Sequence, residues 1–237
     1  YRRELIAGIS HDLRTPLTSI KGYTEGLQDG IADTPEKQKR YYEAIHVRAM
    51  DMEALVDSLS VFSRLENRHH RYQLELVDMK EYLEQLLEEY KEEAEQKKIT
   101  LLMEWTARNT QVKLDLQEMH RVFINLFENS VKYRTKERSV IKLILDERGT
   151  DLEIRVADDG PGVPEADLEH IFNSFYRGDA SRTKPGSGSG LGLAIVKQIV
   201  EGHGGKICAY NDHGLVIVIT LPLVRERLGG RRENGKG

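Results

Sequence analysis

The sequence predicts an α plus α+β protein, in which a helical hairpin precedes an α/β sandwich with helices on one face of a mixed sheet. Three observations lead to this prediction. Apolar residues recur three and four positions apart through residues 1–67, which is the period of an α-helix. Residues 68–72 are polar and predict a hinge. Beyond the hinge, strand-like and helical stretches are interspersed, as in α+β domains.

The hairpin is predicted to contain two long helices. The first spans about 1–29, and the second begins after Thr34, which suits an N-cap, with Pro35 at the first helical position. The apolar face of the second helix is wider than a coiled-coil seam. Because two helices cannot bury both faces, we expect a four-helix bundle made by two chains.

The region 73–224 is predicted to form one domain, and the Gly-rich, charged tail 225–237 is expected to be disordered. A loop at 176–189 interrupts the domain, and such long loops are uncommon unless functional. The predicted strands are 73–77, 99–105, 111–114, 139–147 and 151–157, the helices are 79–97, 115–133, 167–174 and 190–202, and a hairpin closes the domain at 205–221.

Composition is typical of a globular protein and excludes some classes. The net charge of −4, with both signs interspersed, shows no nucleic-acid footprint. The single cysteine, Cys208, excludes an internal disulfide, and we expect a buried thiol on a strand. No apolar run reaches the roughly 18 residues of a membrane span. Because the chain begins at Tyr1 in helical pattern without a start methionine, we expect a fragment of a longer protein.

The first motif is "SHDLRTPL", which places His11, Asp12, Thr15 and Pro16 on the first helix. A proline inside a helix costs about 3 kcal/mol or more. We hypothesise that Pro16 loosens the helix and lets helix motion change how His11 is presented. Thr15 lies on the same face as His11, and an ordinary surface threonine is the alternative interpretation.

The second motif is "NLFENSVKY". Asn125, Asn129 and Lys132 share one helix face. Amide oxygens suit Mg²⁺ and an ammonium group suits a phosphate oxygen. A solvated helix face is the alternative.

The third motif is "VADDGPGVP", at the end of a strand. Asp158 can accept a hydrogen bond from an exocyclic amine such as that of adenine, and Gly160 and Gly162 allow close approach of a ligand to the backbone. A plain turn explains the same residues.

The fourth motif, "GSGSGLGLAIVKQIV", places Gly188, Gly190 and Gly192 at the start of a helix. Backbone N–H groups at a helix start can bind phosphates. Arg177 lies in the preceding loop and adds positive charge. A flexible linker is the alternative, but it does not explain the glycine spacing.

In order and separation, these motifs resemble those of the cytoplasmic core of sensor histidine kinases of two-component systems. "SHDLRTPL" resembles the H box, "NLFENSVKY" the N box, "DDGPG" the G1 box, "IFNSFYR" the F box and "GSGSGLGLAIVK" the G2 box. The resemblance covers nearly all of 1–223. Three mild departures are Ser187, Asp159 and Ser130, where the family often has glycine, asparagine and alanine.

The resemblance implies a function for each part. By this resemblance, residues 1–67 form a dimerisation and histidine phosphotransfer domain. Residues 73–224 form a catalytic domain that binds ATP and Mg²⁺. His11 is then the phosphoacceptor, Asp12 orients its ring, and Thr15 supports phosphatase activity toward a response regulator. The implied partners are a second copy of the chain and that response regulator. The parent protein is expected to be a bacterial sensor that reaches the membrane only through a missing N-terminal region, with this portion in the cytoplasm.

The resemblance also implies the nucleotide site. Asn129 is the expected Mg²⁺ ligand with Asn125 in support, Lys132 contacts phosphate, Tyr133 stacks on the base and Asp158 binds the adenine amine. The other implied nucleotide-binding residues are Gly160, Gly162, Phe172, Phe175, Arg177, Gly188, Gly190, Leu191 and Gly192.

Three alternatives remain open at this point. One is an ATP hydrolase of the gyrase, Hsp90 and MutL type, although Asn125 stands where those enzymes have a glutamate that activates water. Another is a serine kinase resembling the anti-sigma-factor group, which lacks the helical hairpin. The last is a non-catalytic dimeric scaffold.

Overall fold

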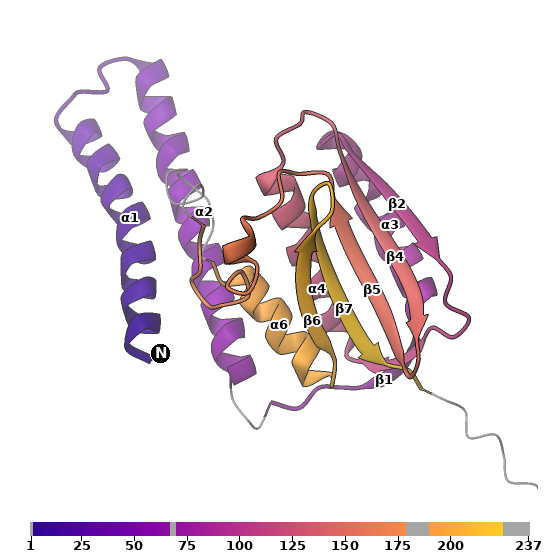
Figure 1. Cartoon of the computed structure of the whole chain (residues 1–237). Coiled ribbons are helices and arrows are strands. Elements are labelled where there is room, and N and C mark those ends of the chain that lie inside the picture. Colours follow the sequence, from indigo (N-terminus) through magenta and orange to yellow (C-terminus); the bar gives the residue numbers. More distant parts are fainter. Residues whose placement is uncertain (1, 67–69, 179–189, 225–237) are drawn as a thin grey trace, which may run out of the picture.

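The computed structural model describes residues 2–66, 70–178 and 190–224, without the side chains of residues 2–7. It confirms the predicted fold class: a helical hairpin lies beside a domain that combines a mixed sheet with helices (Figure 1). Part of the predicted hinge, Gly188 and the predicted disordered tail lie outside the described residues.

The hairpin consists of α1 (Arg2–Gln28) and α2 (Pro35–Glu66). The first helix runs unbroken through Pro16. Thr34 caps the second, because its hydroxyl oxygen accepts a hydrogen bond from the backbone N–H of Lys37 at 3.2 Å. Near the tip, the ring of Tyr41 packs edge-on against Tyr23, with 5.2 Å between centroids. The tyrosine contact packs α1 against α2.

The five-stranded sheet has the order β2-β4-β5-β7-β6, in which only the β2–β4 pair is parallel. A separate antiparallel pair joins β1 to β3. The strands are β1 (Glu75–Asp78), β2 (Ile99–Trp105), β3 (Gln111–Leu114), β4 (Ser139–Arg148), β5 (Asp151–Asp158), β6 (Lys206–Asn211) and β7 (Leu215–Pro222). The mixed pairing matches the predicted class.

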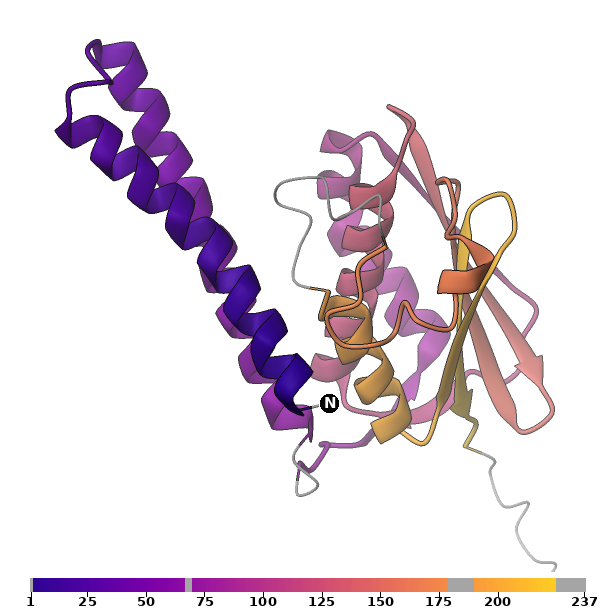
Figure 2. The same ribbon diagram turned by 60° about the vertical axis from the view of Figure 1, so that its left-hand side comes forward.

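One face of the sheet is covered by α3 (Met79–Gln96), α4 (Leu116–Tyr133) and α6 (Gly192–Gly202), which separate it from the hairpin (Figure 2). Alternate residues of the central strands point into this layer, so Ile141 and Leu143 are buried. The other face carries Cys208, on the edge strand β6, and its thiol is exposed. The expectation of a buried thiol was therefore wrong, because the strand alternation directs this side chain away from the helices.

The predicted helix at 167–174 was also wrong. The structure has a single 3₁₀ turn, η1 (Glu165–Asp167), followed by further turns. Asn173 and Ser174 favour turns, and Phe175 then adopts a left-handed backbone conformation with φ of 62°.

The hairpin and the domain share one hydrophobic core. Phe62 of α2 is 1% exposed and belongs to the same buried cluster as Ile195 and Val196 of α6. At the same end of α2, the guanidinium of Arg64 donates to Glu118 of α4 at 2.6 Å. Among the helices of the described ranges, none has the length and apolar character needed to cross a bilayer.

Candidate active site

The first part of the site is a histidine and an aspartate on α1. His11 is 77% exposed, and its Nδ1 lies 3.1 Å from Oδ1 of Asp12, which is only 16% exposed. Neighbouring residues do not normally face each other on a helix, but here the aspartate side chain reaches the ring. In the tautomer that carries its proton on Nδ1, that proton donates to the carboxylate and Nε2 keeps its lone pair.

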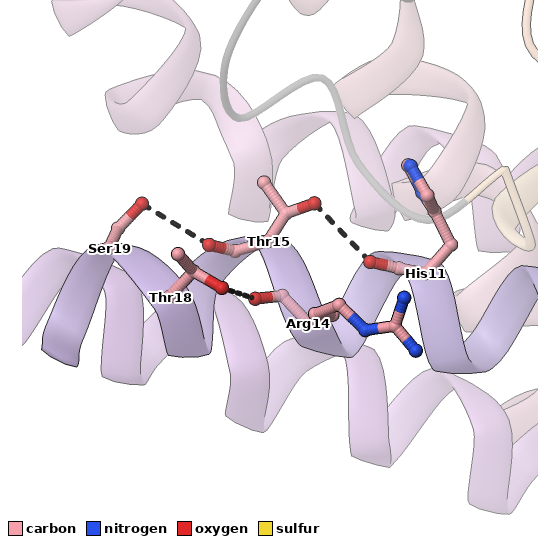
Figure 3. A pocket seen from close by; sticks show the side chains of 5 residues that line it. All are labelled: His11, Arg14, Thr15, Thr18 and Ser19. Atoms are coloured by element: carbon pink, nitrogen blue, oxygen red, sulfur yellow. Dashed lines mark hydrogen bonds between the residues drawn. The ribbon is translucent and has the colours of Figure 1, made fainter. Parts of the chain in front are cut away.

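A cavity of about 400 Å³ lies along α1 beside this pair, lined by His11, Arg14, Thr15, Thr18 and Ser19 (Figure 3). The hydroxyl groups of Thr15, Thr18 and Ser19 donate to helix carbonyls at 3.3, 2.8 and 3.2 Å, respectively. Their oxygen lone pairs remain available as acceptors. Arg14, Thr18 and Ser19 were missed in the sequence, although helical spacing from His11 is a signal that could have found them.

The second part of the site lies where α4 faces the start of α6. A Cβ atom added to Gly192 would lie 2.9 Å from Oδ1 of Asn125 and 4.0 Å from Nδ2 of Asn129. The amide of Asn125 donates to the carbonyl of Arg121 at 2.9 Å, which turns its oxygen toward α6. The side-chain amides of Asn125 and Asn129 thus lie beside the N-terminus of α6, whose N-cap residue makes no side-chain cap bond.

Two cations lie near the end of α4. Nζ of Lys132 is 4.9 Å from the ring centroid of the half-exposed Tyr133. Although Lys132 as a residue is exposed, the burial of its ammonium group, together with the charge of Arg177, lowers the pKa of Lys132 to about 8. A negatively charged ligand nearby would favour the charged form of this partly desolvated ammonium group.

Asp158 lies at the end of β5, and both of its carboxylate oxygens accept hydrogen bonds. Its Oδ1 accepts from the backbone N–H groups of Gly160 and Leu215, at 2.9 and 3.1 Å. Its Oδ2 accepts from the hydroxyl of Ser130 at 3.2 Å. Ser130 therefore orients the aspartate rather than merely replacing a small alanine. Gly162 has φ of +71° and packs on Asn211, so the fold itself requires a glycine there.

The remaining predicted residues that the structure describes lie just before residue 179 and at the start of α6. Phe172 is buried, and Leu191 is fully buried in the core, so the Leu191 side chain does not face a ligand. The backbone N–H of Phe175 donates to the carbonyl of Gly190 at 3.0 Å. Gly190 itself has φ of +67°, and a Cβ there would lie 2.9 Å from the Phe175 backbone.

The two parts of the site meet at Phe175 and Arg177. A Cβ added to Gly8 of α1 would lie 3.1 Å from the Phe175 ring. Nη1 of Arg177 lies 4.0 Å from Oδ1 of Asp12. The segment that carries Phe175 and Arg177 thus contacts the helix that carries His11.

Two family models match in tandem. Residues 1–68 match the His Kinase A (phospho-acceptor) domain, and residues 114–225 match the histidine kinase-, DNA gyrase B-, and HSP90-like ATPase. The chain belongs to the sensor histidine kinase family. This family accounts for the order of the helical hairpin and the mixed-sheet domain.

Curated relatives agree with this membership. Sensor histidine kinase WalK of Bacillus subtilis is 31% identical over 95% of this chain and 37% of its own length. Sensor protein kinase WalK of Staphylococcus haemolyticus is 34% identical over 93% of this chain and 36% of its own length. The chain therefore spans little more than a third of these relatives.

Solved histidine kinases share the fold. The Acinetobacter baumannii histidine kinase AdeS is 26% identical, with a TM-score of 0.67 over 91% of this chain and 98% of its own. Histidine kinase ThkA in complex with the response regulator protein TrrA is 24% identical, with a TM-score of 0.76 over 93% of this chain and 61% of its own. The second likeness concerns the fold alone.

Proposed function

We propose that this chain transfers the γ-phosphoryl group of ATP to His11 and then passes it to an aspartate of a response regulator. The observation that carries the proposal is the His11–Asp12 pair: an exposed imidazole whose Nδ1 faces a carboxylate at 3.1 Å. Only a few groups in a protein can present a free nitrogen lone pair near neutral pH, and a neutral imidazole is one of them.

In the proposed reaction, the Nε2 lone pair of His11 attacks the γ-phosphorus. A nitrogen–phosphorus bond forms, and the bond from the γ-phosphorus to the β–γ bridging oxygen breaks, so that ADP leaves with the electron pair. The proton on Nδ1 stays hydrogen-bonded to Asp12, which stabilises the positive charge that develops on the ring.

The residues around α4 and α6 fit a magnesium nucleotide. The amide oxygens of Asn129 and Asn125 would hold Mg²⁺ together with phosphate oxygens, and the ion would neutralise phosphate charge. Lys132 would bind a phosphate oxygen, Tyr133 would stack on the base, and Asp158 would accept from the adenine amine. The backbone N–H groups at the Gly192 end of α6 would bind phosphate.

The finer assignments follow from the family and the hairpin. We assign residues 1–67 to dimerisation with a second copy and to phosphotransfer, 68–72 to a hinge, and 73–224 to nucleotide binding. Thr15, whose hydroxyl oxygen can accept from water, is assigned to phosphatase activity toward the response regulator. We place the chain on the cytoplasmic side of a parent sensor that a further segment anchors in the membrane.

Incubation with γ-labelled ATP tests the proposal. The label should be stable to alkali, labile to acid and absent in His11→Gln. His46→Gln is a matched control, because His46 is an exposed histidine on the other helix of the hairpin, and it should retain the label. Label that persists in His11→Gln would contradict the assignment.

The hydrolase alternative predicts a different outcome, namely fast release of free phosphate without labelled protein. The structure disfavours it, because Asn125 cannot act as a base and its amide is bound to the carbonyl of Arg121. A labelled protein with slow phosphate release would distinguish the kinase from both the hydrolase and a non-catalytic scaffold.

A further inference from the structure

We propose that Arg177 is a positioning residue for phosphoryl transfer, and that it acts on His11 by holding the carboxylate of Asp12. This inference rests on the proposed function, since it concerns the same acceptor histidine. This role differs from binding of Arg177 to a phosphate group, because here the guanidinium acts on Asp12 of the helix that carries His11.

The geometry joins three side chains through one oxygen atom. Oδ1 of Asp12 lies 3.1 Å from Nδ1 of His11 and 4.0 Å from Nη1 of Arg177. The side chains of Asp12 and Arg177 are 16% and 21% exposed, whereas that of His11 is 77% exposed. Water screens a partly buried charge contact less than an exposed one. The guanidinium therefore biases which carboxylate oxygen faces the ring.

The loop that carries Arg177 is held on α1 by a second contact. The ring of Phe175 packs where Gly8 has no side chain, one helical turn before Asp12 on the same stripe of α1. Phe175 has φ of 62°, a conformation that non-glycine residues rarely adopt and that persists only where surrounding contacts impose it. The hydrogen bond from its N–H to the Gly190 carbonyl is one such contact.

The same guanidinium also lies close enough to Lys132 for its charge to act on that ammonium group. Arg177 thus lies between the acceptor helix and a residue of the proposed phosphate site. Its removal would leave Asp12 free to turn away from His11, so that the ring loses its fixed tautomer. The effect should appear in the transfer step and not in nucleotide affinity.

A double-mutant cycle tests this inference in the full chain. The variants are Arg177→Gln, Asp12→Asn and the double substitution, with the initial rate of histidine labelling measured at saturating ATP and the Kd of a fluorescent ATP analogue measured separately. We expect Arg177→Gln to lower the labelling rate about tenfold in the wild-type background and less than about twofold in the Asp12→Asn background. The Kd should change less than about twofold.

Two controls separate positioning from structural damage. Arg177→Lys keeps the charge and should restore part of the rate, which a merely structural role would not do. Arg108→Gln alters an exposed arginine of the same domain and should leave both quantities unchanged. Additive losses in the cycle, or a loss of ATP affinity with an unchanged saturating rate, overturn the inference. If the wild-type chain binds the analogue but takes up no label, the proposed function itself is overturned. This outcome differs from those that overturn only the role of Arg177.

Discussion

Arg64, in the last turn of α2, donates a hydrogen bond at 2.6 Å to Glu118, a carboxylate on α4 that is only 3% exposed. The pair joins the helical hairpin to the mixed-sheet domain beside the buried Phe62. Nε of Arg121 also lies near Glu118, at 3.6 Å. The ion pair therefore stabilises a shared interface rather than either domain alone.

Removal of Arg64 should destabilise the chain. In Arg64→Ala, the buried negative charge of Glu118 loses its nearest cation. Because the Arg64 side chain is itself 48% exposed, we expect the free energy of unfolding to fall by only about 1–2 kcal/mol. Urea unfolding followed by the fluorescence of Trp105, the single tryptophan, measures it. Lys39→Ala removes an exposed pair with Glu43 and should have little effect. Equal stability of the two variants would contradict the buried role of the pair.

His203 predicts a pH dependence of stability. Burial lowers the pKa of the His203 imidazole from its ordinary value of 6.5, and the neutral ring accepts from the N–H of Asp115 at 2.9 Å. Because the unfolded chain then binds the proton more readily, the contribution of His203 is complete above about pH 6.5 and is lost as the pH falls below that value. As the pH falls below about 6.5, the urea midpoint of unfolding should decline less steeply in His203→Gln than in the wild-type chain. An identical slope in both proteins would rule out this contribution.

Lys132 predicts a pH dependence of nucleotide binding. Its pKa of about 8 means that the ammonium group is charged near pH 7 and largely neutral near pH 9. The affinity for an ATP analogue should therefore fall about three- to tenfold across that range. Lys132→Arg keeps its charge throughout and should lose less affinity. If wild type and Lys132→Arg respond alike, Lys132 does not contact the phosphates.

Two glycines predict opposite effects of the same substitution. Gly190→Ala forces a side chain into a backbone with φ of +67° and to within 2.9 Å of Phe175, so stability should fall by about 1–3 kcal/mol and labelling with it. Gly22 lies inside α1, and among the described residues an added Cβ would meet no atom within 4 Å beyond the local helix backbone. Gly22→Ala should therefore stabilise the chain by about 0.5–1 kcal/mol. Thermal unfolding checks both, and a stabilised Gly190→Ala would refute the close packing of this loop.

Sequence periodicity predicted most of the helices and strands, whereas the motifs and the family resemblance that they carry supplied the candidate site residues. The spacing of Asn125, Asn129 and Lys132 places them on one face of α4 because a helix repeats every 3.6 residues. Asp158 lies at the end of a strand that its β-branched residues had indicated. Prediction failed at 167–174, where the structure has turns in place of the predicted helix and where Asn173 and Ser174 themselves favour turns. It also failed for Cys208, because its own neighbours do not show which face of the sheet lacks helices.

The sequence alone determined the two structural classes and the order of the motifs, because each depends on residues close together in the chain, and the resemblance carried by these motifs implied the candidate acceptor. Only the tertiary structure decided that Arg64 meets Glu118, 54 residues away, that Phe175 rests on Gly8 and that Arg177 faces Asp12. The physical reason is that helix and strand periods depend on neighbouring residues, whereas contacts between distant segments depend on how buried surfaces pack together.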